Sequence, residues 1–101
     1  MPYFAVTVER GAVWDWSLPM RRQQEWDAHA AFMDALVTEH FILIGGPLGD
    51  EDKAPRILHV VQAPDESAVL QRLAADPWHR SGMLHIAGIE PWTVLLGSLG
   101  S

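Results

Sequence analysis

The segment LAADPWHRSGMLHIAGIEPW, residues 73–92, contains the end of a predicted helix, an Asp-Pro turn and the start of the last predicted strand. Pro77 has no amide hydrogen to donate within a helix, and it biases Asp76 towards an extended backbone. We therefore expect the helix to end at Ala75, with the Asp76 carboxylate held at its terminus. The same segment holds two of the five histidines and two of the five tryptophans.

Length and composition indicate one globular domain over 1–101, with a flexible tail at 97–101. Apolar residues make up 49% of the chain, and there is no cysteine for a disulfide or a reactive thiolate. The formal net charge is −6 and the seven basic residues are scattered, so we expect neither nucleic acid nor a membrane surface as a partner. The sequence lacks an apolar run of about 18 residues and a signal-peptide pattern, so we expect a cytoplasmic protein.

Apolar periodicity predicts four strands and two helices. The strands are expected at 3–10, 41–46, 56–62 and 83–96, and the helices at 19–39 and 65–75, with Asp65 as an N-cap and an exposed loop at 49–55. The order β-α-β-β-α-β predicts an α+β, ferredoxin-like fold, with a four-stranded antiparallel sheet and two helices on one face. The strands at 41–46 and 56–62 are apolar on both faces, so we expect a homodimer through the open sheet face.

His29 lies with Trp26 on the apolar stripe of the first predicted helix. We expect the strands at 3–10 and 56–62 to be parallel neighbours, so that the two helices run in the same direction. His29 and Asp76 then each lie about 15 Å along their helices, at the same height. A carboxylate beside an imidazole fixes its tautomer and favours a general base. The alternative is structural, with Asp76 as an N-cap and His29 as a satisfied core histidine.

The other histidines, the tryptophans and a glycine-rich run are further candidates for a metal or ligand site. His59, His79 and His85 match no tight metal-ligand spacing, so we expect no metal site and no cofactor. Five tryptophans, two of them in a loop at 12–18 where we expect exposure, indicate core and dimer packing or an aromatic pocket for a flat substrate. The run Gly45-Gly46-Pro47 is not followed by a lysine or a helix start, so it is not a phosphate loop.

An ordered set of short motifs resembles the YciI-like, or YCII-related, family of small dimeric α+β barrel proteins. The motifs span about residues 25–95 and are His29, Gly46-Pro47-Leu48, Ala75-Asp76-Pro77-Trp78 and Glu90-Pro91-Trp92. The resemblance implies a ferredoxin-like fold, a dimer and a site built from His29 and Asp76. For some relatives it also implies lyase or dehydrohalogenase-like chemistry. Many relatives have Arg-Pro just before the histidine, whereas this chain has Glu25-Trp26-Asp27-Ala28.

We therefore expect a small-molecule enzyme, a lyase, isomerase or dehydrohalogenase-like protein, that transfers a proton through a His-Asp dyad without a cofactor. The catalytic residues would be His29 and Asp76, and the substrate-binding residues Trp26, Gly46, Pro47 and Trp78. One alternative is a non-catalytic dimeric module that binds a ligand or supports a pathway partner. Another is a haem- or metal-dependent oxygenase on the same type of barrel. A His29–Asp76 contact that opens to a cavity favours the enzyme, whereas a contact sealed by packing favours the module.

Overall fold

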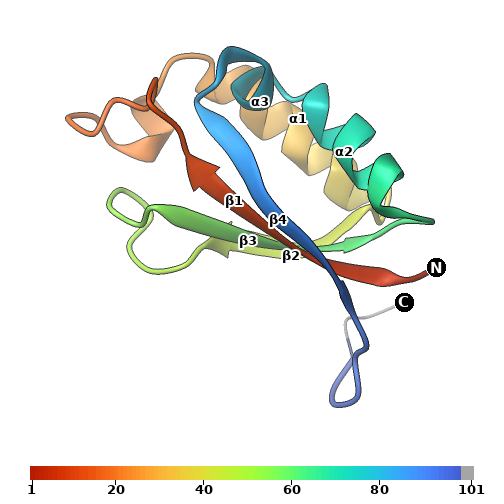
Figure 1. Cartoon of the computed structure of the whole chain (residues 1–101). Helices are drawn as coiled ribbons and strands as arrows, with labels where there is room; N and C mark the ends of the chain where they lie inside the picture. The colour runs from red at the N-terminus through yellow and green to blue at the C-terminus, as the bar shows by residue number, and fades with distance from the viewer. Residues whose placement is uncertain (99–101) are drawn as a thin grey trace.

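The computed structural model describes residues 1–98, which form one four-stranded antiparallel sheet with helices on one face (Figure 1). The strands are β1 (Tyr3–Arg10), β2 (Ile42–Pro47), β3 (Arg56–Gln62) and β4 (Leu84–Trp92), and their order in the sheet is β2-β3-β1-β4. The tail predicted at 97–101 lies outside the described residues from residue 99 onward.

The helices lie on the same side of the sheet, as Figure 1 shows. They are α1 (Trp26–Thr38), α2 (Glu66–Ala74) and the short α3 (Pro77–Ser81), preceded by a 3-10 turn, η1 (Met20–Arg22). This arrangement confirms the predicted α+β, ferredoxin-like fold, with α3 as an additional short helix at the Asp-Pro turn. Among residues 1–98, no helix is both long and apolar enough to cross a membrane.

The strand directions correct one of our predictions. β1 and β3 are neighbours, but they are antiparallel and not parallel. The chain passes from β1 through α1 to β2 and then turns back into β3, which lies between β1 and β2 and opposes both. Because each helix runs back along the strand before it, α1 and α2 are also antiparallel (Figure 1). The start of α1 therefore lies at the same end of the helical layer as the end of α2.

The first helix begins later than predicted, at Trp26 and not at Pro19. Residues 20–22 form only a single 3-10 turn, and Glu25 at the N-cap takes a left-handed backbone conformation with φ 64°. A non-glycine residue in this region interrupts helical hydrogen bonding, so a continuous helix from 19 to 39 does not form. The late start places His29 in the first turn of α1.

Gln23 explains the interruption, because its buried side chain organises the preceding loop. Its amide nitrogen donates to the backbone oxygens of Asp15 (2.7 Å) and Leu18 (3.1 Å), and its oxygen accepts from the Asp15 N–H (3.1 Å). The loop is packed against the domain. Our prediction that both of its tryptophans are exposed was wrong for Trp14, which is 4% exposed, whereas Trp16 is 52% exposed.

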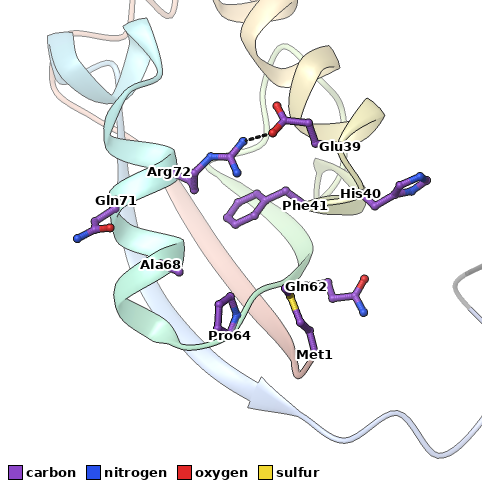
Figure 2. A pocket seen from close by; sticks show the side chains of 9 residues that line it. All are labelled: Met1, Glu39, His40, Phe41, Gln62, Pro64, Ala68, Gln71 and Arg72. Carbon is purple, nitrogen blue, oxygen red and sulfur yellow. Dashed lines mark hydrogen bonds and ion pairs between the residues drawn. The ribbon is translucent and has the colours of Figure 1, made fainter.

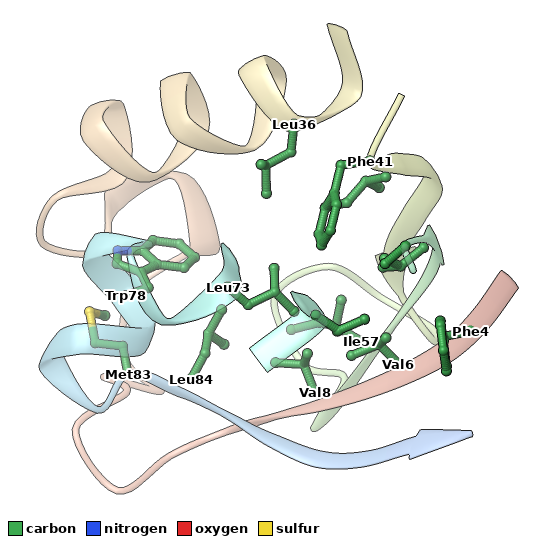
Figure 3. Close-up of a cluster of buried hydrophobic side chains, with 14 of the residues drawn as sticks. Phe4, Val6, Val8, Leu36, Phe41, Ile57, Leu73, Trp78, Met83 and Leu84 are labelled. Atoms are coloured by element: carbon green, nitrogen blue, oxygen red, sulfur yellow. The ribbon is translucent and has the colours of Figure 1, made fainter. Parts of the chain in front are cut away.

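The core lies between the sheet and the helices (Figure 3). β1 alternates strictly, so that every second side chain, beginning with Phe4, is buried under the helices. The other strands and helices complete the layer with Leu36, Phe41, Ile57, Val61, Val69, Leu73, Trp78, Met83 and Leu84. Burial of each large apolar side chain contributes about 1.5–3 kcal/mol, so this layer supplies most of the driving force for folding.

The last strand is shorter than the predicted range 83–96, because it ends at Trp92. Trp92 pairs with Tyr3, the first residue of β1, so the neighbouring strand offers no partner beyond this point. β2 begins at Ile42, and a register shift after Ile42 turns Ile44 towards the face that no helix covers, where it pairs with Val60.

Candidate active site

His29 and Asp76 form a buried pair where the first turn of α1 meets the start of α3. Nδ1 of His29 lies 2.8 Å from Oδ1 of Asp76, and Asp76 is fully buried. The pair forms because the start of α1 and the end of α2 share one end of an antiparallel helix pair. The sequence prediction places the two residues at the same height, each about 15 Å along one of two parallel helices. The helix direction and the helix start were both wrong, and the two errors compensated.

The two oxygens of the Asp76 carboxylate have different partners. One makes the helix-cap contact and the other makes the contact with His29. Oδ2 accepts from the backbone N–H of His79 (3.3 Å), so Asp76 is the N-cap of α3, and Pro77 occupies the first helical position. Oδ1 faces His29. Because an ionised carboxylate cannot donate, Nδ1 of a neutral His29 carries the shared hydrogen and Nε2 is left as an acceptor. The cap thus orients a carboxylate that selects one tautomer of His29.

Trp78 packs flat on His29. The ring centroids are 3.8 Å apart and the planes differ by 9°. The indole is held in place because its Nε1–H donates to the backbone oxygen of Gln24 (2.7 Å) and Trp14 packs against it edge-on, with centroids 5.1 Å apart. The negative face of the indole therefore lies against the imidazole.

His29 opens into a cavity of about 330 Å³ between α1 and the sheet, a volume within the range of small-molecule pockets. The lining residues are Met20, Arg21, Trp26, His29, Met33, Asp34, Val37, Ile42, Gly45, Gly46, Pro47, Glu51, Ile57, His59 and Trp78. All four residues that we expected to bind substrate are in this set, and Asp76 lies behind His29. Within residues 1–98, Nε2 of His29 has no hydrogen-bond partner, so the dyad faces a cavity and is not sealed by packing.

His59 also lines this cavity, although from the sequence we considered it only as a metal ligand. It lies on β3 opposite Gly45 of β2, and its ring rests on the Gly45 backbone. A methyl carbon at position 45 would lie 2.2 Å from Nδ1 of His59, so glycine is needed there for the ring to fit. The alternation of β3 was the available signal, because Ile57, His59 and Val61 share the buried face.

Burial lowers the pKa of His59 from 6.5 to about 4, and the nearby His79 and His29 act in the same direction. Between these values the unfolded chain binds a proton at His59 and the folded chain does not. The free energy of unfolding should therefore fall, as the pH is lowered from 6.5 to 4, by about 3 kcal/mol on account of this residue. Urea unfolding measured across this pH interval should show this fall in the free energy of unfolding in the wild type and not in His59→Leu.

The difference between the two proteins makes this test specific. Burial also lowers the pKa of His79, so a dependence of the same sign remains in both proteins, and only the difference between them reports on His59. Identical pH dependence in the wild type and in His59→Leu would show that the His59 imidazole is not protected from protonation.

Two loops meet at the mouth of the cavity. Arg21 and Glu51 both line it and form an ion pair of 3.0 Å. The backbone N–H of Met20 donates to Oδ1 of Asp52 (2.8 Å), so the loop predicted at 49–55 is tied to the segment before α1. The Arg21–Glu51 pair is largely exposed and contributes little to stability, but it places one positive and one negative group beside the opening.

A second hollow, of about 540 Å³, lies at the opposite end of α1 (Figure 2). Figure 2 shows Arg72 of α2 paired with Glu39 (2.9 Å) beside Phe41. Ten residues of helix, about 15 Å, separate Glu39 from His29. Neither His29 nor Asp76 lines this hollow, so it is separate from the candidate site.

The three histidines that we weighed as a metal site are placed in different surroundings. His59 lines the cavity, His79 lies on α3, and His85 forms an exposed pair with Glu9 (3.1 Å). In the part of the chain that the structure describes, no group of three or more His, Asp or Glu side chains is arranged to hold a metal ion.

Comparisons with known proteins add a family and a related fold. The family model described as YCII-related domain matches residues 1–93. Among solved structures, the 5-chloro-2-hydroxyhydroquinone dehydrochlorinase of Burkholderia phenoliruptrix, in complex with 2,5-dihydroxybenzoquinone, is similar with a TM-score of 0.60 and 19% identity, over 93% of this chain and 95% of that chain. A comparison with curated protein sequences gives no significant match. The structural likeness establishes a shared fold.

Proposed function

This chain belongs to the YCII-related family, and from that premise we propose that it is a cofactor-independent small-molecule enzyme, a lyase or isomerase with dehydrohalogenase-like chemistry. The observation that carries the proposal is the His29–Asp76 pair, which is 2.8 Å long and opens through His29 into a cavity. The related fold of a dehydrochlorinase supports the same class of reaction.

In the proposed reaction Nε2 of His29 removes a proton from a hydroxyl or carbon next to a carbonyl. The electron pair of the broken bond to hydrogen forms a new π bond in the substrate. In an elimination from a chlorinated hydroquinone, a proton first moves from one hydroxyl to the ring carbon that carries the chlorine, which creates a carbonyl. Removal of a second hydroxyl proton then expels chloride with its bonding pair, so the product has lost one proton and one chloride. In an isomerisation, the same proton returns at another carbon. Asp76 holds the tautomer of His29 and stabilises the imidazolium that forms.

The cavity favours a small, flat and largely apolar substrate. Trp26 presents aromatic surface close to His29, with the two ring centroids 6.0 Å apart. Trp78 also lines the cavity, but its indole is 1% exposed because it stacks on His29. Gly46 and Pro47, at the end of β2, also line the cavity. Aromatic rings stack on such surfaces, which would hold a substrate ring within reach of the imidazole.

The proposal is tested by incubating the purified protein with 5-chloro-2-hydroxyhydroquinone under nitrogen, without added cofactor. We expect one chloride released for each quinone formed, measured by ion chromatography and by absorbance. His29→Gln should reduce the reaction to the uncatalysed rate, whereas His85→Gln, which alters an exposed histidine on β4, should retain wild-type activity.

Chloride release at equal rates in the wild type and in His29→Gln would contradict the proposed role of His29. Binding of the compound without turnover, at any pH at which the protein is folded, would instead support a ligand-binding module. Both outcomes are interpretable because thermal unfolding measured in parallel shows whether the variant is folded.

We further propose that the protein is a homodimer that packs through the open sheet face. The helices cover one face, and on the other Ile44 is 57% exposed beside Val60. A two-fold pairing of identical faces would remove this apolar surface from water. Light scattering at micromolar concentration should give twice the chain mass of 11.3 kDa.

Ile44→Glu tests the interface more cleanly than a substitution of Val60, which is already 2% exposed in the single chain. The glutamate at position 44 can remain solvated in a monomer, but it would lose that solvation in the dimer. We expect a folded protein of monomer mass. Leu70→Glu, at a similarly exposed position on α2, should leave the dimer intact. A wild-type protein of 11.3 kDa in solution would rule the dimer out.

A further inference from the structure

His59 is held on the floor of the cavity by a specific local arrangement. β3 and β2 pair His59 with Gly45, and the absence of a side chain at Gly45 leaves the space that the imidazole occupies. The residue is 6% exposed, and it shares the cavity with His29. A polar ring in this position has no evident packing advantage over the apolar side chains around it.

The two nitrogens of His59 have no hydrogen-bond partner within residues 1–98. Nδ1 is buried against Gly45 without a partner, and no hydrogen bond engages Nε2. A buried N–H without an acceptor is rarer in proteins than an unfilled acceptor, so the single hydrogen of the neutral ring belongs on Nε2. The low pKa of His59, about 4, keeps the ring neutral near pH 7. His59 thus offers the cavity one N–H donor.

We propose that His59 is a substrate-binding residue whose Nε2–H donates a hydrogen bond to a substrate oxygen while His29 takes up the proton. The inference rests on the proposed function and adds to it the class of substrate. That class is a flat ring with two oxygen substituents, one beside His29 and one beside His59. As the proton leaves, negative charge spreads through the ring to the second oxygen, where the N–H of His59 stabilises it.

The tautomer of His59 is the first test. Nitrogen-15 NMR of the histidine side chains at neutral pH should show His59 protonated at Nε2 only, with His59→Leu used to assign its signals. Protonation at Nδ1 in the free protein would overturn the proposal, because the ring would then present an acceptor to the cavity. This measurement needs no ligand and no activity.

Binding of 4-nitrocatechol, a flat ring with two hydroxyl groups, is the second test. Its absorption changes when a hydroxyl loses its proton, so one titration reports both the dissociation constant and the protonation state of the bound probe. His59→Leu should raise the dissociation constant by about 10- to 100-fold, the range for a hydrogen bond to a charged group. His59→Gln, which keeps an N–H donor, should raise it less.

Gly45→Ala provides a variant that leaves the imidazole chemically intact. The added methyl would lie 2.2 Å from Nδ1, so the ring must move. We expect weaker binding of 4-nitrocatechol, and no further weakening when Gly45→Ala is added to His59→Leu. Gly88→Ala, on β4 where an added methyl meets no atom within 4 Å, should bind as the wild type does.

The outcomes separate this inference from the proposed function. If the wild type and His29→Gln bind the probe with its proton retained but His59→Leu still weakens binding, the proton transfer fails and the role of His59 stands. If the probe loses its proton to the wild type and binds folded His59→Leu equally well, the role of His59 fails and the proton transfer stands. A wild type that binds no 4-nitrocatechol would contradict the substrate class.

Discussion

Asp76→Asn should lower the rate constant for proton transfer by about 10²- to 10⁴-fold while the fold is retained. The asparagine oxygen can still accept the N–H of His79 and cap α3, since asparagine is as good an N-cap as aspartate. The amide NH₂ then replaces Oδ1 and faces Nδ1 of His29. A donor at this position forces the hydrogen of the neutral imidazole onto Nε2, which removes the basic nitrogen from the cavity.

The measurement is the rate of chloride release, with nitrogen-15 NMR of His29 to identify its tautomer. Asp65→Asn is the matched control, because Asp65 caps α2 through the N–H of Ala68 (2.8 Å) and does not line the cavity. It should keep full activity. If Asp76→Asn retained the wild-type rate constant and left the His29 tautomer unchanged, Asp76 would be a helix cap and nothing more.

Trp78→Ala should lower the free energy of unfolding by about 3–5 kcal/mol, the range for removal of a large buried aromatic side chain. Trp78 is 1% exposed and contacts Trp14, Trp26 and His29. Figure 3 shows it among the buried side chains of the core. Its removal would leave a void next to His29 and would take away the N–H that donates to the Gln24 carbonyl. Urea unfolding at neutral pH measures the change.

Two variants separate packing from the hydrogen bond and from surface effects. Trp78→Phe keeps an aromatic ring but loses the Nε1–H, so we expect a loss of about 1–3 kcal/mol. Trp16→Ala, at a position that is 52% exposed, should change the free energy of unfolding by less than about 1 kcal/mol. A Trp78→Ala protein as stable as Trp16→Ala would show that the packing around Trp78 is not part of the core.

Local signals in the sequence were sufficient for the presence and order of the four strands and the two longer helices. The alternation of β1 and the short apolar run of β3 predicted both strands at their observed bounds, because both patterns are set by residues close together in the chain. Asp65 and Asp76 were identified as caps because a side chain three residues away satisfies the helix N–H. The order of these elements then predicted the ferredoxin-like topology.

The site itself was only half determined by the sequence. His29 and Asp76 were chosen from a helical stripe, an Asp-Pro turn and a family resemblance, but the geometry used to join them was wrong. Residue pattern alone could not show that Gln23 would turn back to bind the loop and delay α1, nor that the two helices would be antiparallel. His59 was not recognised as a cavity residue, since its position in the cavity depends on the glycine opposite it on another strand.

The sequence by itself determined the strands, the caps and the fold class, and the tertiary structure decided which polar groups meet. The reason is the range of the interactions involved. Caps and strand alternation act within a few residues, whereas the His29–Asp76 contact joins residues 47 apart. Whether those side chains face each other, and whether they open to a cavity, depends on how the helices pack on the sheet, and packing is a property of the assembled core.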